Sequence, residues 1–209
     1  MDFIIKTYKE LLKNLLRQGY TFLTFPESLS GNGKKFIILR HDVDRLPANS
    51  LRFARIEAEH GIRGTYYFRV VKESWDEDVI REIAGMGHVG YHYEDLGATA
   101  QRCNGAMVEE ELVKLAIERF KINLERLRKI VPVKTICMHG SPMSRWDSRL
   151  LWKYYDYHDF GITGEPYFDL NFDEVFYLTD TGRRWDGDVV SVRDKALGVT
   201  TFANASAVE

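Results

Sequence analysis

The sequence contains few of the features that mark secreted, membrane or nucleic-acid-binding proteins. Its 209 residues include two cysteines, Cys103 and Cys137, and no Cys-x-x-Cys pair, which favours free thiols in a reducing compartment. No stretch approaches the ~18 consecutive apolar residues that a membrane span requires. The formal net charge is -2, so no basic surface is expected that would attract nucleic acid or an anionic membrane.

The sequence also lacks internal repeats, low-complexity segments and a basic leader followed by an apolar run. A cytoplasmic protein without a membrane span is therefore expected. Hydrophobic residues make up 44% and charged residues 29% of the chain, which is ordinary for a globular domain with one sizeable core. Nothing in this composition indicates an oligomeric state.

Apolar periodicity predicts strands that alternate with helices along most of the chain. The connections are short, so the strands are expected to be parallel and joined by right-handed crossovers. This pattern is typical of a barrel or of an open doubly wound sheet, and in both the functional residues gather at the carboxyl ends of the strands. Helices are predicted over residues 3–18, 49–60, 76–84, 107–130 and 146–155, and strands over 20–25, 36–45, 65–71, 89–94, 133–138, 160–162 and 175–178.

The stretch 36–45 carries the strongest chemical signal. Four apolar residues lead directly into Arg40-His41-Asp42-Val43-Asp44, as in a buried strand that ends at a cleft. Asp42 and Asp44 are two residues apart, so they leave a strand by the same face. Like charges this close raise each other's pKa, and a bound cation relieves the repulsion. The stretch indicates either a metal or acid–base site or a solvated turn whose charges face water.

Two later predicted strands also end in residues that can bind metals. His92 and Glu94 close the strand 89–94, and His139 follows the strand 133–138. Because the carboxyl ends of parallel strands meet at one edge, these side chains are expected to converge with the two aspartates. Aspartate and histidine together suit zinc or a similar divalent ion such as iron, cobalt or nickel.

His88 and His92 have the four-residue spacing of a metal-binding pair on a helix. The alternation within 89–94 favours a strand, on which that spacing separates the two side chains by ~13 Å at ~3.3 Å per residue. A single ion with bonds of ~2 Å cannot join them. His92 is therefore the better candidate ligand, unless the chain turns between the two residues. His60, His158 and Cys137 are expected to be structural, Cys137 as a buried thiol.

Two motifs together resemble the polysaccharide deacetylase family, also called the NodB-homology domain. They are Arg40-His41-Asp42-Val43-Asp44 and Gly87-His88-Val89-Gly90-Tyr91-His92-Tyr93-Glu94-Asp95-Leu96. The sequence is similar to a divergent bacterial branch that carries His-Asp-Val-Asp in place of Thr-Phe-Asp-Asp. With His139-Gly140-Ser141-Pro142, the resemblance covers about residues 36 to 142.

The resemblance implies a distorted (β/α)7-type barrel with parallel strands. The chain would form a single domain over 1–209, with an N-terminal helix and strand extension at 1–35, the barrel at 36–188 and a tail at 189–209. It also implies metal-dependent removal of an acetyl group from an amino sugar or polysaccharide precursor. In such a site Asp42 would be the general base, and Asp44 and His92 would bind the metal.

The chain departs from the family pattern at one metal ligand. The second histidine of the family's motif would fall at Leu96, which cannot bind a metal. Either His88 pairs with His92 through a shift in register, or His139 supplies the ligand, or no metal binds. His139 is favoured because it lies at a strand end. Further candidates for the surroundings of the metal or for substrate contact are His41, Glu94, His88, Asp180 and Trp185.

The family's closing motif, a leucine-rich strand ending in histidine, is not evident after residue 159. An open or incomplete C-terminal end of the barrel is therefore compatible with the sequence. The same departure leaves two alternatives to a metallohydrolase. One is a catalytically inactive carbohydrate-binding or assembly protein on the same scaffold, and the other is a metal-free amide hydrolase.

Overall fold

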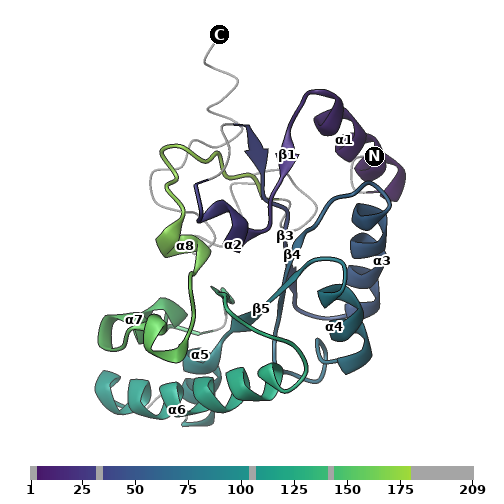
Figure 1. The fold of residues 1–209 in the computed structure, drawn as a ribbon. Coiled ribbons are helices and arrows are strands. Elements are labelled where there is room, and N and C mark those ends of the chain that lie inside the picture. The colour runs from purple at the N-terminus through teal and green to yellow at the C-terminus, as the bar shows by residue number, and fades with distance from the viewer. Residues whose placement is uncertain (1–3, 32–34, 104–106, 141–143, 180–209) are drawn as a thin grey trace.

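The computed structural model describes residues 4–31, 35–103, 107–140 and 144–179, in which strands alternate with helices (Figure 1). The strands are β1 (Thr21–Phe22), β2 (Phe36–Ile37), β3 (Arg40–Val43), β4 (Thr65–Phe68), β5 (His88–Tyr93) and β6 (Ile136–Met138). The α-helices are α1 (Ile5–Arg17), α2 (Phe25–Ser28), α3 (Pro47–Ala58), α4 (Glu77–Ala84), α5 (Asp95–Arg102), α6 (Glu109–Arg128), α7 (Leu151–Tyr154) and α8 (Pro166–Asp169), and the short 3-10 helices are η1 (Ser148–Leu150) and η2 (Tyr157–Phe160).

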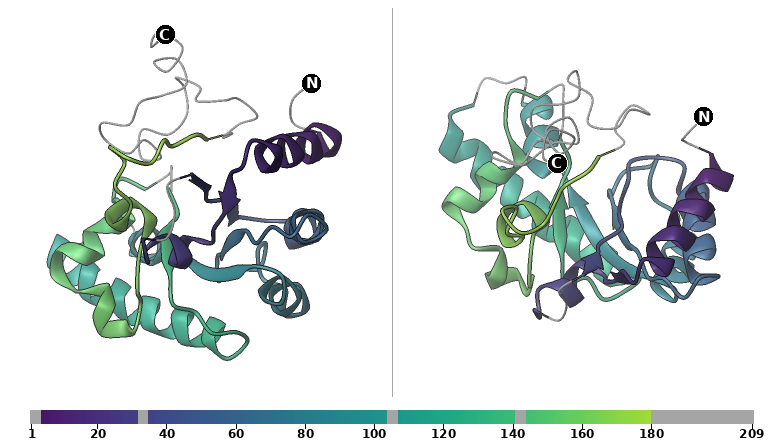
Figure 2. Two further views of the ribbon diagram at one scale, coloured as in Figure 1. Left: turned by 45° about the horizontal axis from the view of Figure 1, so that its top comes forward. Right: turned by 90° about the horizontal axis from the view of Figure 1, so that it is seen from above.

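Four strands form a parallel sheet in the order β3-β4-β5-β6, which curls like half of a barrel (Figure 2). The strands β1 and β2 pair separately, also in parallel. These pairings confirm the predicted α/β class with parallel strands. The described residues form this half-barrel and not a complete barrel of seven strands.

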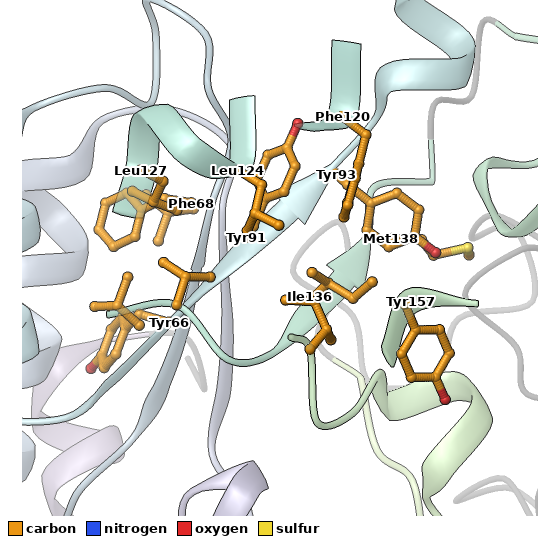
Figure 3. Packing of buried hydrophobic residues seen from close by; sticks show 14 of the residues in the cluster. Tyr66, Phe68, Tyr91, Tyr93, Phe120, Leu124, Leu127, Ile136, Met138 and Tyr157 are labelled. Carbon is orange, nitrogen blue, oxygen red and sulfur yellow. The ribbon is translucent and has the colours of Figure 1, made fainter. Parts of the chain in front are cut away.

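One face of the four-stranded sheet carries the main hydrophobic core. Successive strand residues point to opposite faces, so every second side chain enters this core. Aromatic residues from β4 and β5 pack there against the apolar stripe of α6, as Figure 3 shows. The strand residues concerned are Val43, Tyr66, Phe68, Val89, Tyr91, Tyr93, Ile136 and Met138, and those of α6 include Phe120, Leu124 and Leu127.

The opposite, inner face of the sheet carries the polar residues of the predicted site. Asp42 is in register with Tyr67, and Tyr67 with Gly90. A Cβ atom at Gly90 would lie 2.3 Å from the Tyr67 ring, so that ring occupies the space of a side chain. Two residues after Gly90 on β5, His92 is in register with Cys137 of β6. Parallel pairing thus places Asp42, His92 and Cys137 on the same side of the sheet.

The predicted strand 36–45 is divided between the two sheets, which corrects the expectation of one continuous strand. Phe36–Ile37 pairs with β1, and Arg40–Val43 pairs with β4. The two residues between them pack into separate clusters: Ile38 joins Phe25 and Cys137, whereas Leu39 joins the cluster beneath α1. Because these two side chains pack into different clusters, the chain leaves the β1–β2 sheet here and enters the four-stranded sheet.

The predicted strand 20–25 is shorter than expected, because α2 begins directly after it. Thr24 donates from its backbone N–H and its hydroxyl to Glu27 Oε2, at 2.8 and 2.6 Å. This Thr-x-x-Glu pattern forms a capping box with Pro26 in the first helical turn. The sequence therefore contained a helix-start signal where Pro26 was interpreted only as the end of a strand.

Two further predicted strands are corrected, and one helix was missed. Residues 157–160 form η2, and Gly161 follows with φ of 68°, so no strand forms at 160–162. Residues 175–178 have no strand pairing. The helix α5 was not predicted, and it begins directly after the motif residue Glu94. The predicted tail 189–209 lies outside the described residues.

A buried carboxylate joins the N-terminal helix to the sheet. Glu57 of α3 is 1% exposed and accepts hydrogen bonds from Tyr8 (2.6 Å), Tyr66 (2.7 Å) and His41 Nε2 (2.7 Å). The His41 ring stacks on Tyr66 with centroids 4.5 Å apart. Burial by itself raises the pKa of Glu57, but the charge and hydrogen bond of His41 and the two tyrosine hydroxyls outweigh it and lower the pKa below 4.5.

The variant Glu57→Ala is expected to lower the free energy of unfolding by roughly 3–5 kcal/mol, because the buried hydroxyl of Tyr66 and the half-buried donors of Tyr8 and His41 lose their acceptor. The control Glu59→Ala removes an exposed partner of Lys9 at the end of the same helix and should cost much less, because water screens this ion pair. Urea unfolding at pH 7 measures both. Equal losses in the two variants would contradict the role given to Glu57.

The same network predicts a pH dependence of stability. Since the pKa of Glu57 is lower in the folded chain than its ordinary value of 4.5, its contribution is complete above that value and is lost as the pH falls through the folded pKa. The difference in unfolding free energy between wild type and Glu57→Ala should therefore shrink at acid pH. A constant difference between pH 7 and acid pH would be inconsistent with an ionised Glu57.

Candidate functional site

Five of the predicted site residues converge at the carboxyl edge of the four-stranded sheet. Asp42 and Asp44 come from the end of β3, His92 and Glu94 from the end of β5, and His139 from the residue after β6. His92 Nε2 lies 3.6 Å from Asp44 Oδ1 and 4.0 Å from Asp42 Oδ2. His139 Nε2 lies 3.5 Å from the same Asp44 oxygen. The parallel topology thus assembles these side chains from three strands.

Both imidazole rings are held through their Nδ1 atoms. His92 Nδ1 is 2.9 Å from the backbone oxygen of Cys137, and His139 Nδ1 is 3.2 Å from Glu94 Oε2. Because each neighbour is an oxygen acceptor, the Nδ1 atoms act as donors and leave the Nε2 lone pairs directed towards Asp44. An oxygen acceptor on the far nitrogen is the usual arrangement around a histidine that binds a metal.

The oxygen Oδ1 of Asp44 is buried and has no hydrogen-bond partner among the described residues. A buried oxygen without a partner is costly unless something else satisfies it. In a tetrahedral site with bonds of ~2.0–2.1 Å, neighbouring ligand atoms lie ~3.3 Å apart. The distances of 3.5 and 3.6 Å from this oxygen to the two Nε2 atoms are close to that spacing. Asp44 Oδ1 is thus within reach of an ion shared with either imidazole, although the three ligand atoms do not all lie within 4.8 Å of one another.

A second, overlapping group adds a ligand that was not predicted. Asp42, His92 and Cys137 each offer one ligand atom, and within the described part of the chain they form the group of three whose ligand atoms all lie within 4.8 Å of one another. Cys137, expected to be a purely structural thiol, is fully buried beside His92. The sequence did contain a signal for this ligand. Cys137 lies two residues before His139, and side chains two residues apart leave a strand by the same face.

The imidazole of His92 is held in the form that binds metals. Burial is the largest influence and lowers the pKa of His92, while the charges of Asp42 and Asp44 oppose this only in part. The side chain is 3% exposed, so protonation would leave a charge with little access to water. A neutral imidazole is the ligand form, and no proton has to be displaced when a metal binds.

Asp42 is paired with Arg40 from the same strand. Arg40 Nη2 lies 3.1 Å from Asp42 Oδ2, and it also donates to the hydroxyls of Tyr167 (3.2 Å) and Tyr177 (3.1 Å). Burial by itself raises the pKa of Asp42, but the charge of Arg40 outweighs it and holds the pKa below its usual range. The Asp42 side chain is 27% exposed, so it is ionised and still accessible.

Glu94 links the site to Arg69 of the neighbouring loop. Arg69 Nη2 contacts both carboxylate oxygens of Glu94, at 2.7 and 2.6 Å. Burial by itself raises the pKa of Glu94, but hydrogen bonds from His139 and Arg69 lower it to about 2. Glu94 is therefore a permanent anion that orients His139. Arg69 follows β4 directly and was not singled out by the sequence.

Other sequence candidates lie away from this group. His41 points to the opposite face of β3 and contacts Glu57. His88 begins β5 and its Nε2 lies 2.7 Å from Thr135 Oγ1, at the end of the strand remote from His92. Leu96, at the position of the missing histidine, is fully buried in the main core. Asp180 and Trp185 lie outside the described residues.

Comparisons with known proteins identify no relative of this chain. No family model matches the chain, and a search of curated proteins finds no match. Within the described residues, no helix is long and apolar enough to cross a membrane.

Proposed function

We propose that the chain is a metal-dependent hydrolase that removes an acetyl or related acyl group from an amino sugar or polysaccharide precursor. The observation that carries this proposal is the buried, unpartnered Asp44 Oδ1 facing two oriented imidazoles, His92 and His139. These three residues would hold the ion, and Cys137 would lie beside it. Zinc is the first candidate because it accepts oxygen, nitrogen and sulfur ligands, and cobalt, nickel or iron suit the same donors.

The metal would supply the larger part of the chemistry. Zinc in such a site lowers the pKa of a water molecule from ~15.7 to ~7 and polarises a carbonyl group. At ~1.36 kcal/mol per unit, that change corresponds to ~12 kcal/mol. A positioned carboxylate base typically adds ~10²–10⁴-fold. An amide, which resists neutral water, would need both contributions.

The residues around the ion have separate tasks in this proposal. Asp42, kept ionised by Arg40, accepts the proton of the attacking water. Glu94 holds the ring of His139 in place. His139 is assigned as a ligand, so the proton that the leaving amine takes as the C–N bond breaks is the one that Asp42 accepted from the water. The half-barrel with functional residues at its carboxyl edge supports a distorted (β/α)7-type barrel for the domain.

The purified protein is expected to release acetate from at least one member of a panel of N- and O-acetylated amino sugars and their oligomers. Chelation should abolish the release, and zinc or cobalt should restore it, because the ion carries most of the rate enhancement. Acetate is measured by a coupled assay, beside total metal. Full activity after complete chelation would favour the metal-free amide hydrolase. Sugar binding without either metal or acetate release would favour the non-catalytic carbohydrate-binding protein.

A further inference from the structure

A cavity of about 550 Å³ opens directly beside the proposed metal site. Glu94 and His139 line one side of it, so it is continuous with the strand-end residues. Gly97, which has no side chain, and Ala98, whose side chain is a methyl group, also line it from α5 and take up little of the space. A volume of this size is within the ~300–1,000 Å³ that is usual for small-molecule sites.

Three arginines line this cavity against one carboxylate. They are Arg69 from the loop after β4, Arg102 from the end of α5 and Arg119 from α6, and the carboxylate is Glu94. The charge of Arg69 is balanced by its two contacts with Glu94. The other two guanidinium groups come from α5 and α6, which pack against each other (Figure 1). The cavity lining as a whole is therefore positively charged.

The hydrogen-bonding capacity of Arg119 and Arg102 is largely unused. Arg119 Nε is buried without a hydrogen-bond partner among the described residues, and its nearest anion is Asp95 Oδ1 at 3.5 Å. Arg102 is exposed, and within the described residues it has no hydrogen bond or ion pair. Guanidinium groups present several N–H donors in a planar fork that matches the oxygens of phosphate and carboxylate groups.

We propose that Arg102 and Arg119 bind an anionic substituent of the substrate, a phosphate or a carboxylate, while its acyl group lies at the metal site. This inference rests on the proposed function and narrows it to acylated sugars that carry a negative charge. Glu94 and His139 line the same cavity as Arg102 and Arg119, so the cavity extends from the metal site to the two arginines. The two arginines would thus hold the charged group of a phosphorylated or carboxylated sugar, and its acyl group would lie at the metal site.

The test measures binding and does not depend on turnover. The metal-loaded protein is titrated by calorimetry with N-acetylglucosamine, N-acetylglucosamine 1-phosphate and N-acetylmuramic acid at low and moderate salt. The wild type is expected to bind a charged sugar about tenfold to a hundredfold more tightly than the neutral one, as charge-assisted hydrogen bonds allow. That preference should shrink as salt is raised. Comparing the phosphate and carboxylate ligands identifies which group the cavity takes.

The variant Arg102→Gln is expected to lose most of this preference, and since Arg102 is exposed, the change should not disturb folding. Arg119→Lys keeps a charge but removes the planar fork, and should reduce the preference several-fold. The control Arg52→Gln removes the same charge from an exposed position on α3 outside the cavity and should leave the preference unchanged.

Equal binding of neutral and charged sugars by the wild type would overturn the inference, as would an unchanged preference in Arg102→Gln. The same variant distinguishes binding of phosphate at Arg102 from direct binding of phosphate to the metal. A preference caused by the metal would remain in Arg102→Gln. The proposed function fails independently, if no metal binds or no acyl group is released. An anion preference that depends on Arg102 in a protein without hydrolysis would keep the anion site and reject the hydrolase.

Discussion

Replacing His92 by alanine is expected to reduce the bound divalent metal from about one equivalent to a small fraction, and to abolish acyl hydrolysis. His92 belongs to both candidate ligand groups, the one with Asp42 and Cys137 and the one with Asp44 and His139. Its ring is 3% exposed and held through Nδ1, so no neighbouring side chain can take its place without moving the backbone. Metal analysis after dialysis measures the loss.

A matched control separates this effect from the loss of any histidine. His158→Ala removes a ring of η2 that is 56% exposed and that contacts Asp156 and Tyr157, and it should retain the metal and the activity. Thermal unfolding of both variants shows whether the fold is kept. Undiminished metal content in a folded His92→Ala protein would remove this histidine from the site and the metallohydrolase proposal with it.

Replacing Asp42 by asparagine is expected to lower the hydrolysis rate by roughly 10²–10⁴-fold while the metal is retained, because the amide cannot accept the proton of the attacking water. Asparagine keeps the size of the side chain, so the packing around Arg40 changes little. The rate is measured as acetate release at saturating substrate, and the metal content is measured on the same sample.

The variant Asp44→Asn provides the reciprocal comparison. Asp44 Oδ1 is the buried oxygen that faces both imidazoles, so this change is expected to weaken metal binding as well as activity. Opposite behaviour of the two variants would assign the base to Asp42 and the ligand to Asp44. If Asp42→Asn also lost its metal, Asp42 would join His92 and Cys137 as a ligand and would no longer serve as the base.

Local sequence patterns were sufficient to predict the α/β class and the carboxyl ends of three strands. The predicted strands 36–45, 89–94 and 133–138 end within two residues of the ends of β3, β5 and β6. Those patterns depend on side-chain period and on short connections, which act within a few residues. The strand geometry also indicated that His88 and His92 lie at opposite ends of β5, where the structure places them.

Structural features that depend on contacts between distant segments could not be predicted from short stretches of the sequence. The residues 38–39 were expected to continue a strand, yet each packs into a different cluster and the strand divides. The role of Cys137 depends on its register with His92, and that register is set by pairing between segments 45 residues apart. Arg69 and Glu94 become a pair only because the loops after β4 and β5 meet.

The sequence by itself determined the alternation of strands and helices and the ionisable residues at the strand ends, because both follow from local periodicity. Only the tertiary structure decided which of those residues share a site. The packing of α3 against β3 brought Glu57 to His41, and the pairing of β5 with β6 placed Cys137 beside His92. The packing of α5 against α6 brought Arg102 and Arg119 to one cavity. Such distances depend on the packing of whole elements, which no short stretch of sequence contains.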